Sequence, residues 1–416
     1  MARSAYLTAN EAAERLGVRP QTLYAYVSRG LIRSEAGAGR MRRYHAADVA
    51  ALRQKRHPGE AAEAALSFGM PVLDSAITLI FDGKLYYRGQ DATVLARRAS
   101  IRDTAALLWQ EDAAALFAPD NLPVIEPAWT AASGAVAGLK PIERALALLP
   151  IAAASDPRAL DLAPAAVART GARILRLLAA IVAGTAPSSR PVDAVLAEGW
   201  RVGPSARPLL RAALILCADH ELNVSAFAAR CVASAQASPY NAVIAGIAAL
   251  QGGRHGGASE RADAFLAEAL AAPDPTVLAT TYLRRGDRLP SFGHPLYPEA
   301  DPRAKLLLAL MAEQGVPLIG EGMGIAAAVT ALIGRAPNID FALALLRRAL
   351  ALPEGAALAL FLVGRSMGWL AQAQEQYAEG RLIRPRARYV GPPIPGALLL
   401  LAALSTSLMN PQSGWG

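Results

Sequence analysis

The sequence predicts a mainly α-helical protein with a small, basic domain at its N-terminus, and three observations lead to this fold class. Most of the chain beyond residue 92 is rich in Ala and Leu and is interrupted only by short clusters of Pro and Gly. Residues 75–92 alternate apolar and polar side chains around Asp82-Gly83, which indicates a β-hairpin. Residues 1–57 carry eleven basic and four acidic side chains, and thus almost all of the formal net charge of +8.

The overall composition excludes several classes of protein. A hydrophobic content of 53% with 18% charged residues indicates a large core and excludes a disordered chain. The apolar run at residues 396–408 has thirteen residues, fewer than the roughly 20 that a membrane-spanning helix needs, so a buried helix is favoured. The first residues carry charges where a signal peptide needs an apolar stretch, and the two cysteines lack metal-ligand spacing. We therefore expect a cytoplasmic protein.

The basic segment begins with two short helices. Thr8 and Glu11 form a capping box that starts the first helix, and Gly17 ends it. Pro20 starts a second helix, residues 20–29, closed by Gly30. Five apolar residues have the spacing to pack these helices together: Ala12, Leu16, Val18, Leu23 and Val27. The pattern predicts a helix-turn-helix, whose second helix lies in the major groove of DNA.

A Gly-containing hairpin wing tipped by Arg40, Arg42 and Arg43, and then a third helix, are expected after this pair. The stretch "LTANEAAERLGVRPQTLYAYVSRGLI" resembles the winged helix-turn-helix of MerR-type and excisionase-type DNA-binding proteins, over about residues 5–56. The resemblance implies that the wing arginines bind phosphate and that DNA is contacted by Arg19, Gln21, Thr22 and Tyr24. The alternative is a structural appendage that has lost DNA binding. Residues 58–69 then form a linker.

Three of the five histidines lie in unusual surroundings within the helical body. They occur in "CADHELN" (His220), "GGRHGGASE" (His255) and "SFGHPLYPEADPRAK" (His294). A zinc site is disfavoured because the sequence has no His-x-x-x-His or Cys-x-x-Cys spacing. Acid–base chemistry suits the imidazoles better, although each taken singly could be an ordinary loop residue.

An aspartate and several arginines add to this set. Asp340 lies between apolar residues at an expected helix start, where burial raises a carboxyl pKa and suits a base that takes a proton from carbon; the alternative is a helix cap. Arg365 interrupts an apolar helix, residues 356–370, and a buried guanidinium needs an anionic partner. Together with Arg303 and Arg384, it suggests a small dicarboxylate substrate.

The motifs of the body, in their order, resemble those of the citrate synthase family. They are "ITLIFDGKLYYRGQDATVLARRAS", "ADHELN", "GGRHGGASE", "FGHPLY", "DPRA", "PNIDF", "GRSMGWLAQAQEQ" and "IRPR", spread over about residues 69–390. The resemblance implies a two-domain, nearly all-helical fold, with a large domain of residues 70–265 and 361–416 and a small domain of residues 266–360. It also implies a homodimer or higher homo-oligomer, with acetyl-CoA as co-substrate, no other cofactor and no metal.

The resemblance further implies the condensation of acetyl-CoA with oxaloacetate to citrate and CoA. His255 would then hydrogen-bond the thioester oxygen while Asp340 removes a methyl proton, and His294 would polarise and protonate the ketone of oxaloacetate. The carboxylates of oxaloacetate would be held by His220, Arg303 and Arg365, with Arg384 reaching in from the partner subunit. The four glycines around His255 would let the backbone bend tightly there.

Departures from the family pattern leave three alternatives open. Pro295 stands where many members have arginine, Gln372 stands where many have histidine, and the body is short. The acyl-CoA and the oxo acid are therefore not fixed, and 2-methylcitrate synthase or citryl-CoA lyase activity are alternatives. A third alternative is a transcription regulator that senses a metabolite through a synthase-like body.

Overall fold

The computed structural model describes residues 6–36, 42–45, 48–49, 52, 73–253, 255–387 and 391. The chain divides into two compact units, Met1–Ser75 and Ala76–Gly416. The expected linker at residues 58–69 and the apolar run at residues 396–408 lie outside the described residues.

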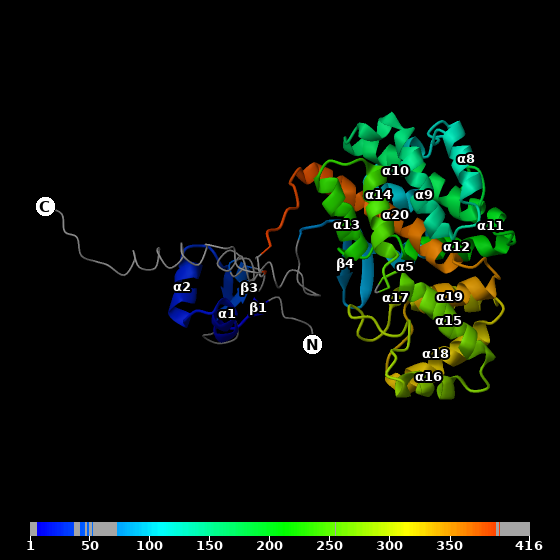
Figure 1. The fold of residues 1–416 in the computed structure, drawn as a ribbon. Coiled ribbons are helices and arrows are strands. Elements are labelled where there is room, and N and C mark those ends of the chain that lie inside the picture. Colours follow the sequence, from blue (N-terminus) through cyan, green and yellow to red (C-terminus); the bar gives the residue numbers. More distant parts are fainter. Residues whose placement is uncertain are drawn as a thin grey trace. The chain divides into compact units, whose positions relative to one another are not determined.

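The N-terminal unit contains two helices and a three-stranded antiparallel sheet of order β1-β3-β2 (Figure 1). Its elements are β1 (Tyr6–Leu7), α1 (Ala9–Leu16), α2 (Pro20–Ser28), β2 (Ser34–Ala36) and β3 (Arg42–His45). Thr8 and Glu11 form the expected capping box, and Gly17 ends α1 in the left-handed region at φ 61°. The helix-turn-helix and the two wing strands are thus confirmed. Most of the expected third helix lies outside the described residues.

A small apolar core holds this unit together. Ala12, Leu16 and Leu23 are buried in it, as the helical spacing predicted. Val18 and Val27 are only partly buried and pack at its edge. A contiguous apolar core of this kind is what distinguishes a folded domain from an unfolded segment, so the unit is a compact fold in its own right.

The second unit begins with a three-stranded antiparallel sheet of order β4-β5-β6. Its strands are β4 (Thr78–Phe81), β5 (Lys84–Tyr87) and β6 (Gln90–Asp91). Asp82 and Gly83 connect β4 and β5 and have φ values of 51° and 70°, as a two-residue hairpin turn requires at both central positions. The hairpin predicted from the alternation in residues 75–92 is confirmed.

Helices build the remainder of the unit, which confirms the mainly α class. They are α5 (Ala92–Arg98), α6 (Ile101–Trp109), α7 (Ala113–Leu116), α8 (Pro127–Ala135), α9 (Pro141–Ala154), α10 (Pro164–Ala183), α11 (Val192–Gly199), α12 (Arg207–Leu216), α13 (Val224–Ser234), α14 (Pro239–Leu250), α15 (Gly257–Ala271), α16 (Pro275–Arg284), α17 (Pro302–Glu313), α18 (Ile319–Ile333), α19 (Ile339–Ala349) and α20 (Ala356–Glu379), with 3-10 turns at Pro157–Leu160 and Pro204–Ala206.

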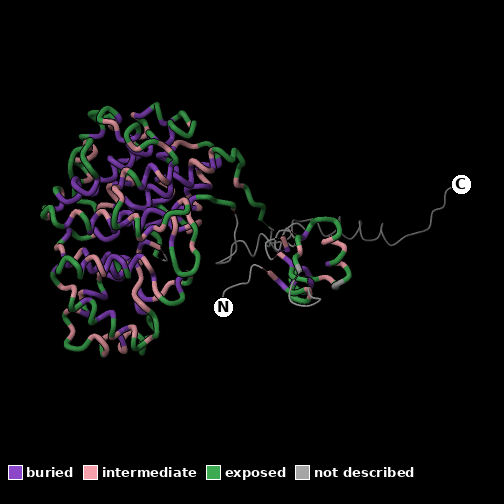
Figure 2. The backbone as a smooth tube through the Cα atoms, turned by 180° about the vertical axis from the view of Figure 1, so that it is seen from behind, coloured by how far each residue is buried: buried purple, intermediate pink, exposed green. Residues whose placement is uncertain are grey.

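Helix α20 runs through the centre of this unit and packs against α10, α12, α13 and α14. Its length and composition would suffice to cross a membrane, but its apolar window is wholly buried, as in the core helix of a folded domain (Figure 2). Gly364 and Gly368 lie against the backbone carbonyls of Leu214 and Ala218, where any Cβ would collide. These contacts place the end of α12, and the residues that follow it, beside the middle of α20.

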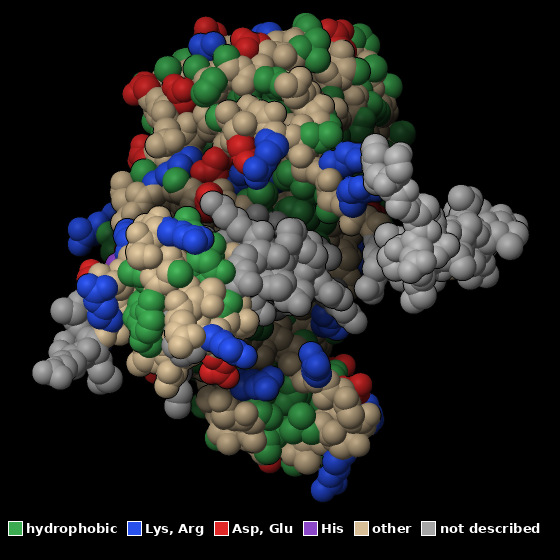
Figure 3. Space-filling model, turned by 90° about the vertical axis from the view of Figure 1, so that its left-hand side faces the viewer, with side chains coloured by type: hydrophobic (Ala, Val, Ile, Leu, Met, Phe, Trp, Pro, Cys, Tyr) green, Lys and Arg blue, Asp and Glu red, His purple; other side chains and the backbone are tan. Residues whose placement is uncertain are grey.

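Helices α15 to α19 pack on one another and lie toward one end of this unit, with α16 and α18 outermost (Figure 1). The expected boundary between large and small domains, at residues 265 and 266, falls inside α15. The division of the body into two domains therefore stays a prediction. Acidic and basic side chains are interspersed over the upper part of the view in Figure 3, in keeping with the near-neutral charge of residues 58–416.

Candidate active site

His220 follows α12 and lies buried between two other rings. Its Nε2 is 3.0 Å from the hydroxyl oxygen of Tyr297, and its ring centroid is 5.0 Å from that of His294. Burial raises the pKa of Tyr297, so its hydroxyl keeps its proton, and the direction of its hydrogen bond with His220 follows the tautomer of that ring. Burial, together with Arg303 and Arg365, lowers the pKa of His220 well below its ordinary value. His220 is therefore neutral at pH 7.

His294 lies in the loop before α17. Its Nδ1 accepts a hydrogen bond of 3.1 Å from the backbone N–H of Leu296, so the proton of the neutral ring is on Nε2. Burial, and then the charge of Arg303, lower the pKa of His294 to about 4. A turn closes when the N–H of Tyr297 donates to the carbonyl of His294 over 3.0 Å. Pro295 fits inside this turn and disturbs neither bond.

Arg303 lies in the first turn of α17 and forms a buried, bidentate ion pair. Its Nε and Nη2 donate to Oδ1 and Oδ2 of Asp301 over 2.9 and 2.8 Å. Asp301 Oδ2 also accepts from the backbone N–H of Ile339 over 3.0 Å, which ties α17 to the start of α19. Arg303 lies with its Cζ 5.6 Å from the ring centroid of Tyr297. Asp301 thus binds one edge of the guanidinium, and the positive charge of Arg303 lies close enough to His220 and His294 to lower their pKa values.

Asp340 lies in the first turn of α19 but does not cap it. The cap is Asn338, whose Oδ1 accepts from the N–H of Asp340 over 3.1 Å and whose Nδ2 donates to the carbonyl of Gly293 over 3.1 Å. Ser259 Oγ donates to Oδ1 of Asp340 over 2.5 Å. Burial raises the pKa of Asp340, while Ser259 and then Arg303 oppose the rise. The helix-cap alternative for Asp340 is therefore excluded, and the carboxyl group has the raised pKa of a base.

His255 lies in the turn between α14 and α15. Its Nε2 is 2.8 Å from Oγ of Ser225, which also accepts from the indole N–H of Trp369 over 3.1 Å. The His255 ring meets the ring of Phe361 edge to face at 5.9 Å. Burial, and then the charge of Arg365, lower the pKa of His255 to about 4. This imidazole is also neutral at pH 7.

The glycines around His255 lie in a tight, hydrogen-bonded turn. None of the four has a positive φ. Gly256 is required by packing, because a Cβ there would collide with the carbonyl of Leu250 and approach Leu358 to 2.8 Å. Gly256 N–H donates to that carbonyl over 2.8 Å, which closes the turn. The turn therefore depends on close approach of two backbone segments rather than on left-handed conformation.

Arg365 lies in the middle of α20 and is fully enclosed. Its Nε donates to the carbonyl of Cys217 over 2.8 Å, and its Cζ lies 4.6 Å from the ring centroid of Phe361. Its Nη2 is buried and has no hydrogen-bond partner among the described residues. Burial lowers its pKa, and Asp219, next to His220, opposes the change. An unpartnered buried guanidinium donor is where an anionic ligand binds most favourably.

Contacts join six of the expected residues into two groups, and the charge of Arg365 in one group lowers the pKa of His220 in the other, so the six together form one buried cluster. Tyr297 touches His220, His294 and Arg303. Asp301 links Arg303 to the backbone beside Asp340, and Phe361 lies against both His255 and Arg365.

Arg384 is outside this cluster. It is exposed in the segment after α20, and no hydrogen bond or ion pair joins its side chain to the cluster within the described part of the chain. Its role toward a partner subunit stays a prediction.

The expected DNA-contacting residues lie on the surface of the N-terminal unit. Arg19, Gln21 and Tyr24 are exposed, and Thr22 is partly buried. On β3, Arg42 and Arg43 are exposed, whereas Arg40 lies outside the described residues. These positions agree with a contact surface but do not test it.

A cavity of about 1000 Å³ is lined by segments that lead to two of the histidines. Its wall includes Gly253, two residues before His255, and Pro290, four residues before His294. Two arginines, Arg261 and Arg288, one aspartate, Asp287, and Tyr282 also line it. The wall thus carries a net positive charge and an aromatic side chain.

Two family models match the chain. "Citrate synthase, C-terminal domain" matches residues 66–386, and "Helix-turn-helix domain" matches residues 6–57. The chain belongs to the citrate synthase family. It is accordingly a condensing enzyme of the acyltransferase type, which carries a helix-turn-helix domain at its N-terminus.

Curated relatives share this assignment. "Citrate synthase 2" of Bacillus subtilis is 30% identical over 358 residues, covering 78% of this chain and 95% of the relative. "Citrate synthase" of Haloferax volcanii is 38% identical over 190 residues, 43% of this chain and 49% of the relative. "Citrate/2-methylcitrate synthase" of Bacillus subtilis is 33% identical over 195 residues, 43% of this chain and 50% of the relative.

Solved structures have the same fold. Citrate synthase from Thermotoga maritima superposes with a TM-score of 0.66 at 25% identity, over 78% of this chain and 94% of that one. Citrate synthase from Thermoplasma acidophilum, a ternary complex with carboxymethyl coenzyme A and oxaloacetate, gives a TM-score of 0.66 at 24% identity. The expected citrate synthase fold is confirmed.

Several polar residues that organise this citrate synthase site were not singled out from the sequence. They are Ser225, Ser259, Tyr297, Asp301 and Asn338. Tyr297 and Asp301 lie within the quoted histidine motif, so their proximity was visible. Asp301 pairs with the nearby Arg303. The partners of Ser225, Ser259 and Tyr297 come from segments distant in sequence, and no local pattern predicts those.

Proposed function

We propose that this protein condenses acetyl-CoA with oxaloacetate to give citrate and CoA. The observation that carries the proposal is the cluster itself: three neutral histidines and an aspartate with a raised pKa occur together with a buried arginine that has an unused donor among the described residues. An acid–base reaction on a dicarboxylate needs these groups together.

Oxaloacetate would bind where the cationic groups converge. Arg365 would give its open donors to one carboxylate, with His220 and Arg303 assisting. His294 holds its proton on Nε2, so it can donate to the ketone oxygen and then protonate the alkoxide as the new carbon–carbon bond forms. Such a donor stabilises charge that develops only in the transition state.

The acetyl group of acetyl-CoA would lie between Asp340 and His255. Asp340 takes a methyl proton, and its raised pKa makes it a stronger base than an ordinary aspartate. His255 would donate to the thioester oxygen from Nδ1 if the Ser225 hydroxyl turned its single proton from Asn223 Oδ1, 2.8 Å away, to His255 Nε2 at the same distance. The indole N–H of Trp369 donates to the same hydroxyl oxygen and holds it in place. A donor of this kind contributes roughly 3 kcal/mol to transition-state stabilisation.

The nucleotide part of CoA would occupy the cavity of about 1000 Å³ beside His255. Arg261 and Arg288 suit the phosphate groups, and the ring of Tyr282 suits a purine.

The product of the condensation, citryl-CoA, is then hydrolysed by water to citrate and CoA. Asp340 as base, His255 and His294 as hydrogen-bond donors, and the thiolate of CoA as leaving group suffice for these steps, so neither a metal nor a further cofactor is required.

A homodimer would complete the site, because Arg384 would reach the oxaloacetate of the partner subunit. Exposed apolar side chains on β4 and α13 support this arrangement. Leu79 and Phe81 on β4 are 55% and 66% exposed, and Val224 at the start of α13 is 69% exposed. Exposed apolar side chains of this size are typical of a subunit interface.

Release of CoA measures the proposed activity directly. Purified protein is mixed with oxaloacetate and either acetyl-CoA or propionyl-CoA, and free thiol is followed with time. We expect thiol release with acetyl-CoA that depends on oxaloacetate. Faster release with propionyl-CoA would instead assign 2-methylcitrate synthesis, which is the alternative favoured by the citrate/2-methylcitrate synthase of Bacillus subtilis among the relatives. If the protein only cleaved citryl-CoA to acetyl-CoA and oxaloacetate, without releasing free thiol, it would be assigned as a lyase.

A purely sensory role is disfavoured by Asp340. A sensor of oxaloacetate needs ligands for carboxylates but has no use for a carbon base with a raised pKa. Absence of thiol release with either acyl-CoA, together with tight oxaloacetate binding, would support the sensor.

We also propose that the helix-turn-helix domain binds DNA through α2 and the wing. DNA, acetyl-CoA and oxaloacetate as binding partners together imply a cytoplasmic location. The exposure of Gln21, Tyr24, Arg42 and Arg43 supports this. Fluorescence anisotropy with duplex DNA should show affinity that falls steeply with salt. Replacing Arg42 and Arg43 by Gln should lower the salt dependence, and equal affinity of a chain lacking residues 1–57 would contradict the proposal.

A further inference from the structure

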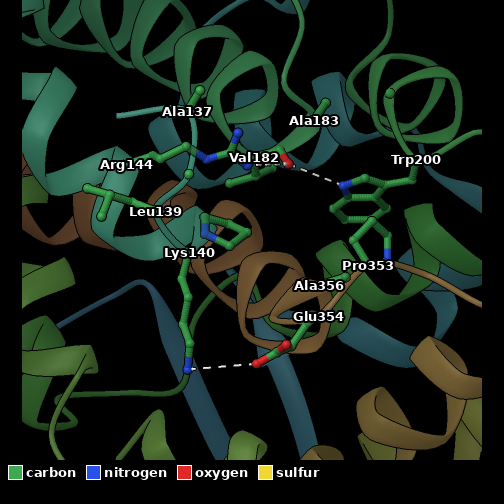
Figure 4. Close-up of a pocket in the computed structure, with 13 residues that line it drawn as sticks. Ala137, Leu139, Lys140, Arg144, Val182, Ala183, Trp200, Pro353, Glu354 and Ala356 are labelled. Carbon is green, nitrogen blue, oxygen red and sulfur yellow. Dashed lines mark hydrogen bonds and ion pairs between the residues drawn. The ribbon is translucent and has the colours of Figure 1, made fainter. Parts of the chain in front are cut away.

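A second cavity, of about 340 Å³, lies away from the candidate active site. It is bounded by the loop before α9, by the C-terminal ends of α10 and α11, and by the start of α20 (Figure 4). Arg144 lies on one side, close to Val182, and Trp200 lies on the other (Figure 4). None of the six clustered site residues lines this cavity.

Arg144 provides a positive charge without a carboxylate partner among the described residues. Its Nη2 donates a long hydrogen bond of 3.4 Å to the carbonyl of Val182, which already accepts from the indole N–H of Trp200 over 3.2 Å. Its Nε is buried and has no partner. Burial lowers the pKa of Arg144, and no neighbouring carboxylate opposes the change. A partly desolvated guanidinium with unused donors binds an anion favourably.

Lys140 and Glu354 limit what that anion can be. Lys140 Nζ is 3.0 Å from Glu260 and 4.0 Å from Glu354, so its charge is already balanced. Glu354 at the mouth of the cavity repels a second negative group on a ligand. A ligand with one anionic group therefore fits better than a polyanion.

The rest of the wall is apolar and flat. Trp200 presents its indole ring, and Leu139, Pro141 and Val182 complete the lining. The first turn of α20, a 24-residue helix, also faces the cavity and adds the positive end of its dipole. These features call for an apolar, planar body attached to the anionic group.

We propose that this cavity binds a small organic anion, with a carboxylate or phosphate on Arg144 and a planar apolar part against Trp200. The site is separate from the proposed oxaloacetate and CoA sites. Binding can therefore be measured whether or not the protein has condensing activity.

Isothermal titration calorimetry on the full-length protein tests the proposal with three probes: benzoate, phenyl phosphate and uncharged benzyl alcohol. We expect benzoate or phenyl phosphate to bind and benzyl alcohol not to bind, and the better anion identifies the preferred head group. Arg144→Gln should weaken that binding at least about tenfold, as loss of a charge-assisted hydrogen bond implies. Arg169→Gln removes an exposed arginine of α10 and is the matched control, which should bind as the wild type does.

A second variant guards against a folding defect in Arg144→Gln. Ala137→Phe fills the cavity without removing a charge and should abolish binding as well. Saturating CoA with oxaloacetate should leave the affinity for the probe unchanged. Absence of binding by both anions, equal affinity in both variants and wild type, or displacement by CoA would each overturn the proposal.

Discussion

The hydroxyl of Ser259 donates a hydrogen bond of 2.5 Å to Oδ1 of Asp340. Ser259 follows His255 by four residues at the start of α15, and its own N–H donates to the carbonyl of Gly256 over 3.0 Å. One turn of the chain therefore positions the imidazole and also sets the basicity of the carboxylate. In the proposed reaction these two groups act on the same acetyl group.

Ser259→Ala should shift the pH dependence of turnover. The hydroxyl stabilises the charged carboxylate, so its removal raises the pKa of Asp340 further. The base is then protonated up to a higher pH, and the acidic limb of kcat should move to a pH about one unit higher. Ser234→Ala, whose hydroxyl donates to the carbonyl of Cys231, is the control and should leave the profile in place. An unchanged profile in Ser259→Ala would separate Ser259 from the base.

Tyr297→Phe should affect the oxaloacetate site selectively. The variant keeps the ring that lies against His294 and Arg303 but loses the hydroxyl that is hydrogen-bonded to His220 Nε2. We expect KM for oxaloacetate to rise about tenfold, as for loss of a buried hydrogen bond, while KM for acetyl-CoA stays the same. Steady-state kinetics with each substrate varied in turn distinguishes this from general damage, which would raise both values.

Arg365→Gln and Asp340→Asn should separate binding from chemistry. Arg365→Gln removes the buried cation and should weaken oxaloacetate binding by at least about tenfold. Asp340→Asn should lower kcat by roughly 10² to 10⁴ while oxaloacetate binding stays nearly unchanged. Calorimetric titration of oxaloacetate, alongside kcat, checks both. Equal losses of binding in the two variants would contradict the roles assigned.

Acid should destabilise the fold through the buried histidines. The pKa values of His255 and His294 are lowered from 6.5 to about 4 by burial, so both are neutral when folded and take up protons on unfolding below pH 6.5. Their contribution to stability is therefore complete above pH 6.5 and is lost as the pH falls toward 4. Urea unfolding over this range should show a falling free energy of unfolding. The fall should be shallower in His255→Gln, and an identical pH dependence would contradict the burial of that ring in neutral form.

Local signals predicted most of the fold. The capping box at Thr8 and Glu11, the turn at Asp82 and Gly83, and the helical body each arise from residues close together in sequence. The same holds for the choice of His220, His255, His294 and Asp340, since each stands out against an Ala- and Leu-rich background.

The remaining features depend on tertiary contacts that the sequence does not display. Ser225 and Trp369 meet only because α13 packs against α20, and Ser259 reaches Asp340 only because α15 packs against α19. A tight turn at Gly256 was expected, but the contact that requires glycine there, its close approach to the carbonyl of Leu250, is not visible in the sequence. The position of Arg384 toward a partner subunit cannot follow from one chain.

Exchange of the methyl protons of acetyl-CoA with deuterated water tests the central claim most directly, because it isolates proton removal by Asp340 from the later steps. The experiment uses a dicarboxylate that fills the oxaloacetate site but has no ketone, such as malate, with detection by mass spectrometry of acetyl-CoA. We predict exchange in the wild type and at least about a hundredfold slower exchange in Asp340→Asn, the range expected for loss of a general base. Exchange at the wild-type rate in Asp340→Asn would show that another group removes the proton and would contradict the account.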